Sequence, residues 1–281
     1  MSAPRPAQSG RHPRGSRKVA QPHLLEKAKG GSTTLAYVLH HYDWSESSLI
    51  LDLFTRERGR IAVAAKGAKK PHSQWRALLL PFHPLRVTFP ASTKADAPEV
   101  HNLRSAEWVG GSAWLHGAAL FSGYYLNELL MKLLARQDPH PQLFDAYDQA
   151  LPHLASSDDG AVQAALRAFE IKLLRHIGVL PELHRQTQTQ QPLLPAERYT
   201  LLGEAGLCAA RLDDSALSGA QWLALQAALE SGAAQALHAA CAQARQPLRG
   251  VLRELLHYHL GTRSLRSRQA LADVQRLLDH S

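Results

Sequence analysis

The chain has 281 residues, 45% of them hydrophobic and 20% charged, and its formal net charge is +8 at pH 7. This length favours two small domains, and the positive charge favours a polyanionic partner, nucleic acid before an anionic membrane surface or an acidic protein. No run of about 18 apolar residues occurs and the only cysteines are Cys208 and Cys241, so we expect a cytoplasmic protein without a transmembrane helix, a disulfide framework or a four-cysteine zinc site.

The first segment, residues 1–32, has the composition of a disordered basic tail. Its first 30 residues contain seven Lys or Arg and one acidic residue, Glu26, with Pro, Gly and Ser scattered among them. Such a sequence cannot bury enough apolar surface to fold, and it lacks the apolar stretch of a secretory signal.

Five short β-like segments follow within residues 33–108. They show alternating hydrophobicity and are separated by turn residues such as Gly59. Five antiparallel strands in so short a span predict a small closed barrel, and an OB-fold is the commonest such barrel that binds nucleic acid. An SH3-like barrel is the competing interpretation. The expected strands are residues 34–44, 47–55, 61–67, 78–89 and 98–107, with Pro81 and Pro84 marking an edge or a bend in the fourth.

Residues 109–281 read as helical, which makes the fold class α+β. The expected helices are residues 117–136, 161–178, 218–230, 246–261 and a final one within 262–278. A polar excursion without helical period, residues 181–211, interrupts them, and a small hairpin around Tyr199 and Gly206 fits its sequence. No internal repeat is present.

The helix expected over residues 161–178 has the clearest pattern. Its apolar stripe steps by three or four residues, and Gly178 ends it. The stripe consists of Val162, Leu166, Phe169, Leu173 and Ile177. The residues off the stripe, which we expect to face solvent, are Arg167, Glu170, Lys172 and Arg175.

Signatures of catalysis are missing from the sequence. It has no phosphate-binding loop ending in Lys-Ser/Thr, no paired-histidine metalloprotease helix and no nucleophile elbow. The 16 histidines show no metal-ligand spacing, and a nuclease would need a carboxylate cluster that the sequence does not offer. We therefore expect neither an enzyme nor a bound metal or cofactor.

A basic stretch, "RGRIAVAAKGAKKPHSQWRA" (residues 58–77), contains six Lys or Arg and no Asp or Glu. Basic side chains around a barrel strand would contact phosphates, and Trp75 and Tyr42 could stack on unpaired bases. A solvated face without function is the alternative. The predicted phosphate contacts are Arg58, Arg60, Lys66, Lys69, Lys70 and Arg76, with a weaker second set of Arg263, Arg266 and Arg268.

Several segments, in this order, resemble the RecO family of bacterial recombination mediators. They are "YVLHHYDWSESSLILDLFTRERGRIAVAAKGAKK", "LLPFHPLRVTF", "LRSAE", "SGYYLNELL", "ALRAFEIKLLRHIG" and "HLGTRSLRSRQ". The resemblance covers the whole chain after residue 32. It implies an N-terminal OB-fold, a helical domain, and an excursion that is a zinc finger in some members. Those members have two cysteine pairs there, whereas this chain keeps only Cys208, so we predict no zinc.

The resemblance also implies a function. RecO proteins bind single- and double-stranded DNA, anneal complementary strands, and act with RecR, in many bacteria also with RecF. They help RecA recombinase to load onto DNA coated by single-stranded-DNA-binding protein (SSB). They do so without making or breaking a covalent bond. Because such a protein works on DNA, the resemblance implies association with the nucleoid. Their helical domain binds the acidic SSB tail, and Arg167 is the matching residue here. The alternative is an adaptor that docks acidic proteins and has little affinity for DNA.

Overall fold

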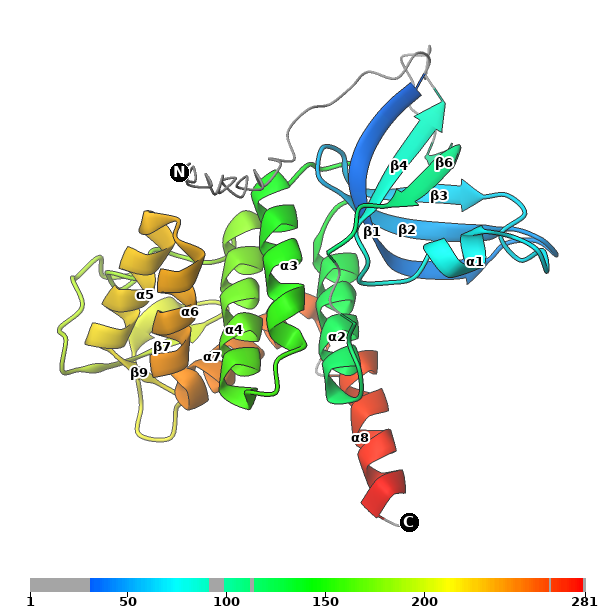
Figure 1. Cartoon of the computed structure of the whole chain (residues 1–281). Coiled ribbons are helices and arrows are strands. Elements are labelled where there is room, and N and C mark those ends of the chain that lie inside the picture. Colours follow the sequence, from blue (N-terminus) through cyan, green and yellow to red (C-terminus); the bar gives the residue numbers. More distant parts are fainter. Residues whose placement is uncertain (1–30, 91–98, 112–113, 263, 280–281) are drawn as a thin grey trace, which may run out of the picture.

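The computed structural model of the chain describes residues 31–90, 99–111, 114–262 and 264–279. A curled β-sheet forms the N-terminal part, and helices with a small second sheet form the remainder, so the fold is α+β as predicted (Figure 1). Residues 1–30 of the expected basic tail, residues 1–32, lie outside the described residues. Its last two residues, Gly31 and Ser32, belong to the first strand, β1.

The N-terminal sheet has the strand order β5-β3-β2-β1-β4-β6. All of its neighbouring strands are antiparallel except β3 and β5, which are parallel. The long first strand pairs with β4 through its first half and with β2 through its second half, which curls the sheet into an OB-fold-like half-barrel. The strands are β1 (Gly31–Asp43), β2 (Leu49–Thr55), β3 (Gly59–Ala65), β4 (Leu85–Pro90), β5 (Val100–Asn102) and β6 (Ser105–Trp108).

Two of the expected strands form differently. The segment expected as one strand over residues 98–107 divides into β5 and β6, which lie at opposite edges of the sheet. The segment 78–84 is not a strand, because Pro81 and Pro84 cannot donate to a ladder and the chain bends there. A short helix, α1 (Trp75–Leu78), precedes this bend.

The C-terminal part contains seven helices within the described residues, two of which, α3 and α6, the sequence analysis missed. They are α2 (Ala118–Leu133), α3 (Pro141–Leu154), α4 (Asp159–His176), α5 (Gly219–Ser231), α6 (Ala234–Gln243), α7 (Arg245–Leu260) and α8 (Arg266–Asp279). The hairpin expected around Tyr199 and Gly206 is present as β7 (Arg198–Leu202) and β8 (Gly206–Ala209), and β7 also pairs with β9 (Leu217–Ser218). None of the described helices has the length and apolar character needed to cross a membrane.

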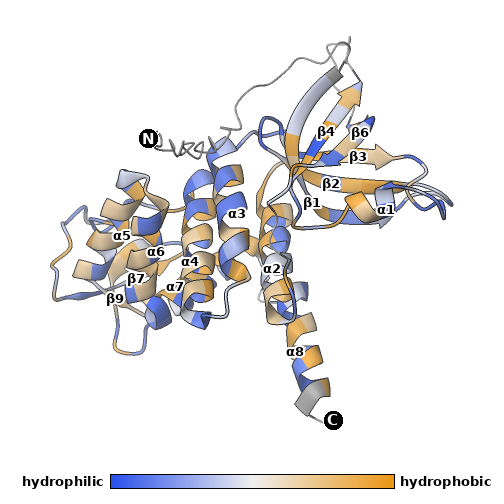
Figure 2. Cartoon of the chain, viewed as in Figure 1, coloured by the Kyte–Doolittle hydropathy of each residue, from blue (hydrophilic) through white to orange (hydrophobic). Residues whose placement is uncertain are grey.

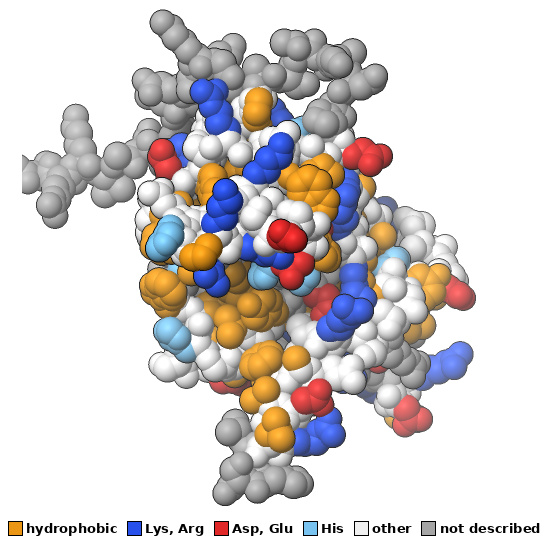
Figure 3. Space-filling model, turned by 90° about the vertical axis from the view of Figure 1, so that its right-hand side faces the viewer, with side chains coloured by type: hydrophobic (Ala, Val, Ile, Leu, Met, Phe, Trp, Pro, Cys, Tyr) orange, Lys and Arg blue, Asp and Glu red, His pale blue; other side chains and the backbone are white. Residues whose placement is uncertain are grey.

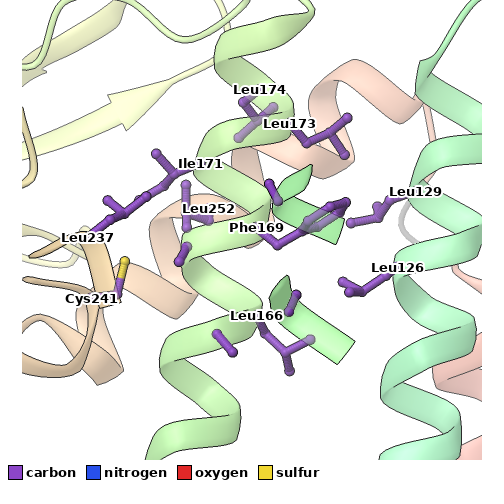
Figure 4. Close-up of a cluster of buried hydrophobic side chains, with 14 of the residues drawn as sticks. Leu126, Leu129, Leu166, Phe169, Ile171, Leu173, Leu174, Leu237, Cys241 and Leu252 are labelled. Carbon is purple, nitrogen blue, oxygen red and sulfur yellow. The ribbon is translucent and has the colours of Figure 1, made fainter. Parts of the chain in front are cut away.

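Helix α4 lies at the centre of the helical part and is apolar on two faces. Figure 4 shows Phe169 pointing towards Leu129 of α2, while Ile171 points the other way, towards Leu237 and Cys241 of α6. A helix packed on both sides buries polar positions as well as its main stripe.

The expectation that Arg167 and Glu170 face solvent is therefore wrong. Arg167 is 3% exposed and Glu170 is fully buried, whereas Arg175 is exposed as expected. Arg167 Nη2 donates a hydrogen bond to Glu170 Oε1 at 2.6 Å, and the Tyr125 hydroxyl donates to the same oxygen at 2.6 Å.

One face of the sheet packs into the hydrophobic core of the helices, while the other buried residues of the sheet form a separate cluster. Tyr37, Leu39 and Phe54 of the sheet belong to the same buried cluster as the helical residues, and Figure 2 shows hydrophobic residues on β2 and on the helices beside it. Across this junction, Asn127 Nδ2 of α2 donates to the Leu39 carbonyl at 3.0 Å. These contacts fix the orientation of the sheet relative to the helices.

An ion pair at the same junction yields a test of its strength. Arg56 Nε and Nη2 donate to the two carboxylate oxygens of Asp145 at 2.9 and 3.0 Å, but their side chains are 30% and 44% exposed. Because water and salt screen such a pair, we expect Arg56→Ala to lower the free energy of unfolding by only about 1 kcal/mol or less. Urea denaturation measures this, with Asp145→Asn as the matched variant. A loss well above that range, or one that persists at high salt, would contradict the expectation.

Candidate nucleic-acid interface

A cleft of about 760 Å³ opens at one end of the sheet, between the loop that follows β3, helix α1 and the first residues of β6. Among the described residues that line it, three are Lys or Arg and none is Asp or Glu. The lining consists of Lys66, Gly67, Lys70, Pro71, His72, Ser73, Gln74, Trp75, Leu78, Arg104, Ser105 and Ala106. We call it the basic cleft.

The loop that forms one wall is anchored to the neighbouring β1–β2 turn. Gly67 adopts a φ of +73°, which favours glycine, and its N–H lies 3.5 Å from Ser48 Oγ. The N–H of Lys69 donates to the Ser47 carbonyl at 2.9 Å, and the side chain of Ala68 is buried in the sheet core. These contacts determine the path of the backbone and leave the side chain of Lys66 exposed.

The predicted phosphate contacts in this loop differ in their surroundings. Lys66, Lys70 and Arg76 are exposed, whereas Lys69 Nζ lies 3.4 Å from Asp43 Oδ1 and its side chain is only 30% exposed. Figure 3 shows this end of the sheet, where Lys and Arg side chains are spread among hydrophobic ones. The basic cleft thus combines the exposed cations of Lys66 and Lys70 with apolar surface, which suits a nucleic acid.

Arg104 is a cleft residue that the sequence analysis missed. It lies between β5 and β6, inside the segment predicted as a single strand, so the sequence does not indicate the bend that brings it beside Lys66 and Lys70. Its positive charge is the signal that the sequence offers. Trp75 lines the same cleft and packs partly against the sheet core, while Tyr42, the other expected stacking residue, is 43% exposed on β1.

The structure separates Arg58 and Arg60 from the other predicted contacts. They lie at the start of β3 and Lys66 follows its end, and a seven-residue strand spans about 20 Å. Arg60 is mostly buried: its Nε lies 3.8 Å from Asp52 Oδ1, and its Nη1 donates to the Met131 carbonyl. Arg60 therefore belongs to the sheet–helix junction, and its burial does not favour the phosphate contact predicted for it.

Arg58 is also engaged with its own sheet. Its Nη2 donates to Ser32 Oγ at 2.5 Å, and its guanidinium lies 5.4 Å from the centroid of the Phe89 ring. Arg58 therefore lies on another part of the sheet than Lys66, and its contact with phosphate stays a prediction.

The residues of the weaker second set that the structure describes have different surroundings. Arg263 lies outside the described residues. The Arg266 side chain is exposed, while its N–H and that of Ser267 donate to Glu128, which thereby caps the start of α8. Arg268 lies over the Tyr125 ring, 4.7 Å from the centroid, and donates to the Tyr125 hydroxyl at 3.1 Å. Arg268 thus attaches α8 to α2.

The residue expected to bind the SSB tail, Arg167, is not accessible as predicted. Its guanidinium is buried beside Glu170 between the layers of the helical part. A carboxylate partner from another protein would have to displace Glu170 and enter the core. Arg167 therefore lacks the exposure that a surface ligand of a carboxylate needs, and the role implied by the resemblance stays a prediction.

Three residues near the excursion could offer ligand atoms to a metal. Glu182, His184 and Glu230 place one such atom each within 4.8 Å of one another. Gln226 Nε2 already donates to both carboxylates, at 2.8 and 2.6 Å, so hydrogen bonding accounts for their proximity. The two thiols are poor ligands, because burial raises the pKa of Cys208 and raises that of Cys241 to about 12.

Comparison with known proteins agrees with this architecture. Residues 32–111 match the family model "Recombination protein O N terminal", and residues 116–269 match "Recombination protein O C terminal". The "DNA repair protein RecO" of Polaromonas naphthalenivorans is 56% identical over 245 residues, covering 86% of this chain and 96% of that protein. The protein of the same name from Delftia acidovorans is 48% identical over 259 residues, covering 90% and 100%. The chain therefore belongs to the RecO family of DNA repair proteins.

Proposed function

We propose that this chain binds single- and double-stranded DNA through the basic cleft and acts as a recombination mediator. In this role it anneals complementary strands and, together with RecR, helps RecA to load onto SSB-coated DNA. The observation that carries the proposal is the cleft itself, where Lys66, Lys70 and Arg104 converge beside Trp75 and no described lining residue is acidic.

The chemistry of the cleft supports binding without catalysis. Lysine and arginine neutralise phosphates and release counterions, which yields affinity for any sequence and a strong dependence on salt. Cleavage of a phosphodiester with divalent metals requires carboxylates beside the phosphate, and the described lining offers none. An exchange of binding partners is therefore the mechanism we assign to the protein, and DNA binding would place it at the nucleoid.

The acidic SSB tail and RecR are the protein partners of this proposal. The positive charge of the chain, +8, favours an acidic peptide in general. The burial of Arg167 means that the tail would use other, exposed residues of the helical part. RecF is a further partner in the same scheme.

The mediator role is tested by the lag before RecA hydrolyses ATP on an SSB-coated single strand. We expect the chain with RecR to shorten this lag, and the Lys66→Ala, Lys70→Ala, Arg104→Ala triple variant to shorten it much less. An unchanged lag with the parent chain, under conditions in which it binds the bare strand, would contradict the mediator role. A shortened lag that the triple variant retains in full would favour the adaptor.

A further inference from the structure

We propose that Trp108 and Trp114 form a stacking platform for unpaired nucleobases at the edge of the basic cleft. The inference rests on the proposed function and deepens it, because it names the form of nucleic acid that this surface selects: a strand whose bases are not paired. The two indoles are among the most exposed aromatic side chains that the structure describes, at 46% and 57%.

Both indoles rest on the same buried ring. The His83 ring centroid lies 5.5 Å from that of Trp108 and 4.5 Å from that of Trp114, and His83 is only 5% exposed. Burial lowers the pKa of His83, so a neutral ring supports the indoles at neutral pH. Trp108 Nε1 also donates to the Leu78 carbonyl at 3.1 Å, which fixes its orientation. The platform is thus built before a ligand arrives.

The position of His83 depends on a strained bend of the backbone at Phe82. Phe82, between Pro81 and His83, adopts a φ of +68°, which is rare for a bulky residue and is kept only where the surroundings enforce it. Its ring is 4% exposed and packs so close to Gly123 that a Cβ there would lie 2.8 Å from it. The sheet and α2 together therefore hold this bend, and with it the position of His83.

The platform adjoins the cations of the cleft. Leu78, whose carbonyl receives the Trp108 hydrogen bond, lines the cleft, as does Ser105 on the same strand as Trp108. Three residues of a strand span about 10 Å, so one short single strand can place its phosphates in the cleft and a base on the platform.

The positive charge of the basic cleft favours a nucleic acid as the ligand of the platform over an apolar segment of a protein. The adjoining cleft, which Leu78 also lines, carries Lys66, Lys70 and Arg104, and every base has a π-face that can stack on an indole. In a duplex the base faces are covered by their neighbours, so a duplex can use the cations but not the platform. The proposal therefore predicts discrimination between ligands that carry the same phosphates.

The test compares three fluorescent ligands of equal length by anisotropy: a thymidine single strand, a single strand with abasic sites, and a duplex. We expect Trp114→Ala and Trp108→Ala to weaken binding of the thymidine strand by about fivefold or more each. Binding of the abasic strand and of the duplex should be unchanged. Trp114→Phe, which keeps an aromatic face, should retain most of the affinity, and Tyr258→Ala, an exposed aromatic on α7, is the control.

Two results would overturn the inference while leaving the proposed function intact. In one, the alanine variants keep the parent's preference for the thymidine strand over the abasic strand. In the other, they weaken all three ligands equally, as a structural role would. A parent chain that binds none of the three ligands would instead overturn the proposed function, and this inference with it.

Discussion

Replacing Glu170 by alanine is expected to lower the free energy of unfolding by about 3–5 kcal/mol, because it leaves the Arg167 guanidinium buried without its counter-charge. Arg167 has no other strong partner: its Nε and Nη1 have no hydrogen-bond partner among the described residues. Glu170 also accepts the hydrogen bond of Tyr125, whose pKa burial and the Glu170 charge raise, so that the hydroxyl keeps its proton. The effect is large because α4 is enclosed on both sides.

Urea denaturation of Glu170→Ala beside a double variant, Arg167→Met with Glu170→Leu, separates the charge from the packing. The double variant removes both charges and keeps apolar volume, so we expect it to recover most of the stability. If the single variant is as stable as the parent, or if the double variant is no better than the single one, the buried pair does not have the role assigned to it.

The second large effect concerns the basic cleft. Replacing Lys66, Lys70 and Arg104 together by alanine removes three cations, so the slope of log K against log salt for a single strand should become less steep by about 2. At 50 mM salt this corresponds to a loss of affinity of about a hundredfold or more. Anisotropy titrations of one labelled oligonucleotide between about 50 and 200 mM salt measure both quantities.

A matched control for this variant lies in the same loop. Lys69 is next to Lys70, but its ammonium is paired with Asp43, so Lys69→Ala should change the slope by much less than Lys66→Ala or Lys70→Ala. A triple variant with the parental slope would show that the cleft cations do not contact phosphate. A Lys69→Ala variant as impaired as the triple one would show that the ion pair with Asp43 opens on binding.

Local patterns in the sequence predict much of this fold and fail where packing decides. Alternation and turn residues place β1, β2 and β3, and the three-to-four spacing places α4. The same spacing occurs in α3, where Leu143, Phe144, Tyr147 and Leu151 are buried, so this missed helix was recognisable. By contrast, one stripe on α4 does not reveal that a second layer covers its other face, and the exposure of Arg167 was mispredicted for that reason.

The candidate site also depends on contacts that local sequence patterns do not predict. The six basic residues of the stretch 58–77 are close in sequence, but β3 is seven residues long and separates Arg58 and Arg60 from the rest. Conversely, Arg104 is remote in sequence and joins Lys66 because β5 runs parallel to β3, with Asn102 opposite Ala64. Neighbours across a sheet depend on topology, which no local pattern encodes.

Ion pairs join the N-terminal sheet to the chain segment that follows α2. Arg60 and Arg136 both approach Asp52, a carboxylate that is 2% exposed, at 3.8 and 3.6 Å. With the packing of Tyr37, Leu39 and Phe54 against the helices, these contacts hold the sheet in place relative to the helices.

The central claim is that a single strand lies in the cleft at the end of the sheet. Photo-crosslinking of a thio-substituted single strand to the full chain, followed by mass spectrometry of the attached peptides, tests it most directly. We expect crosslinks in residues 66–78 and 104–108, which line or adjoin the cleft. Crosslinks confined to α5, α6 and α7, on the far side of α4 from the sheet, would contradict it (Figure 1).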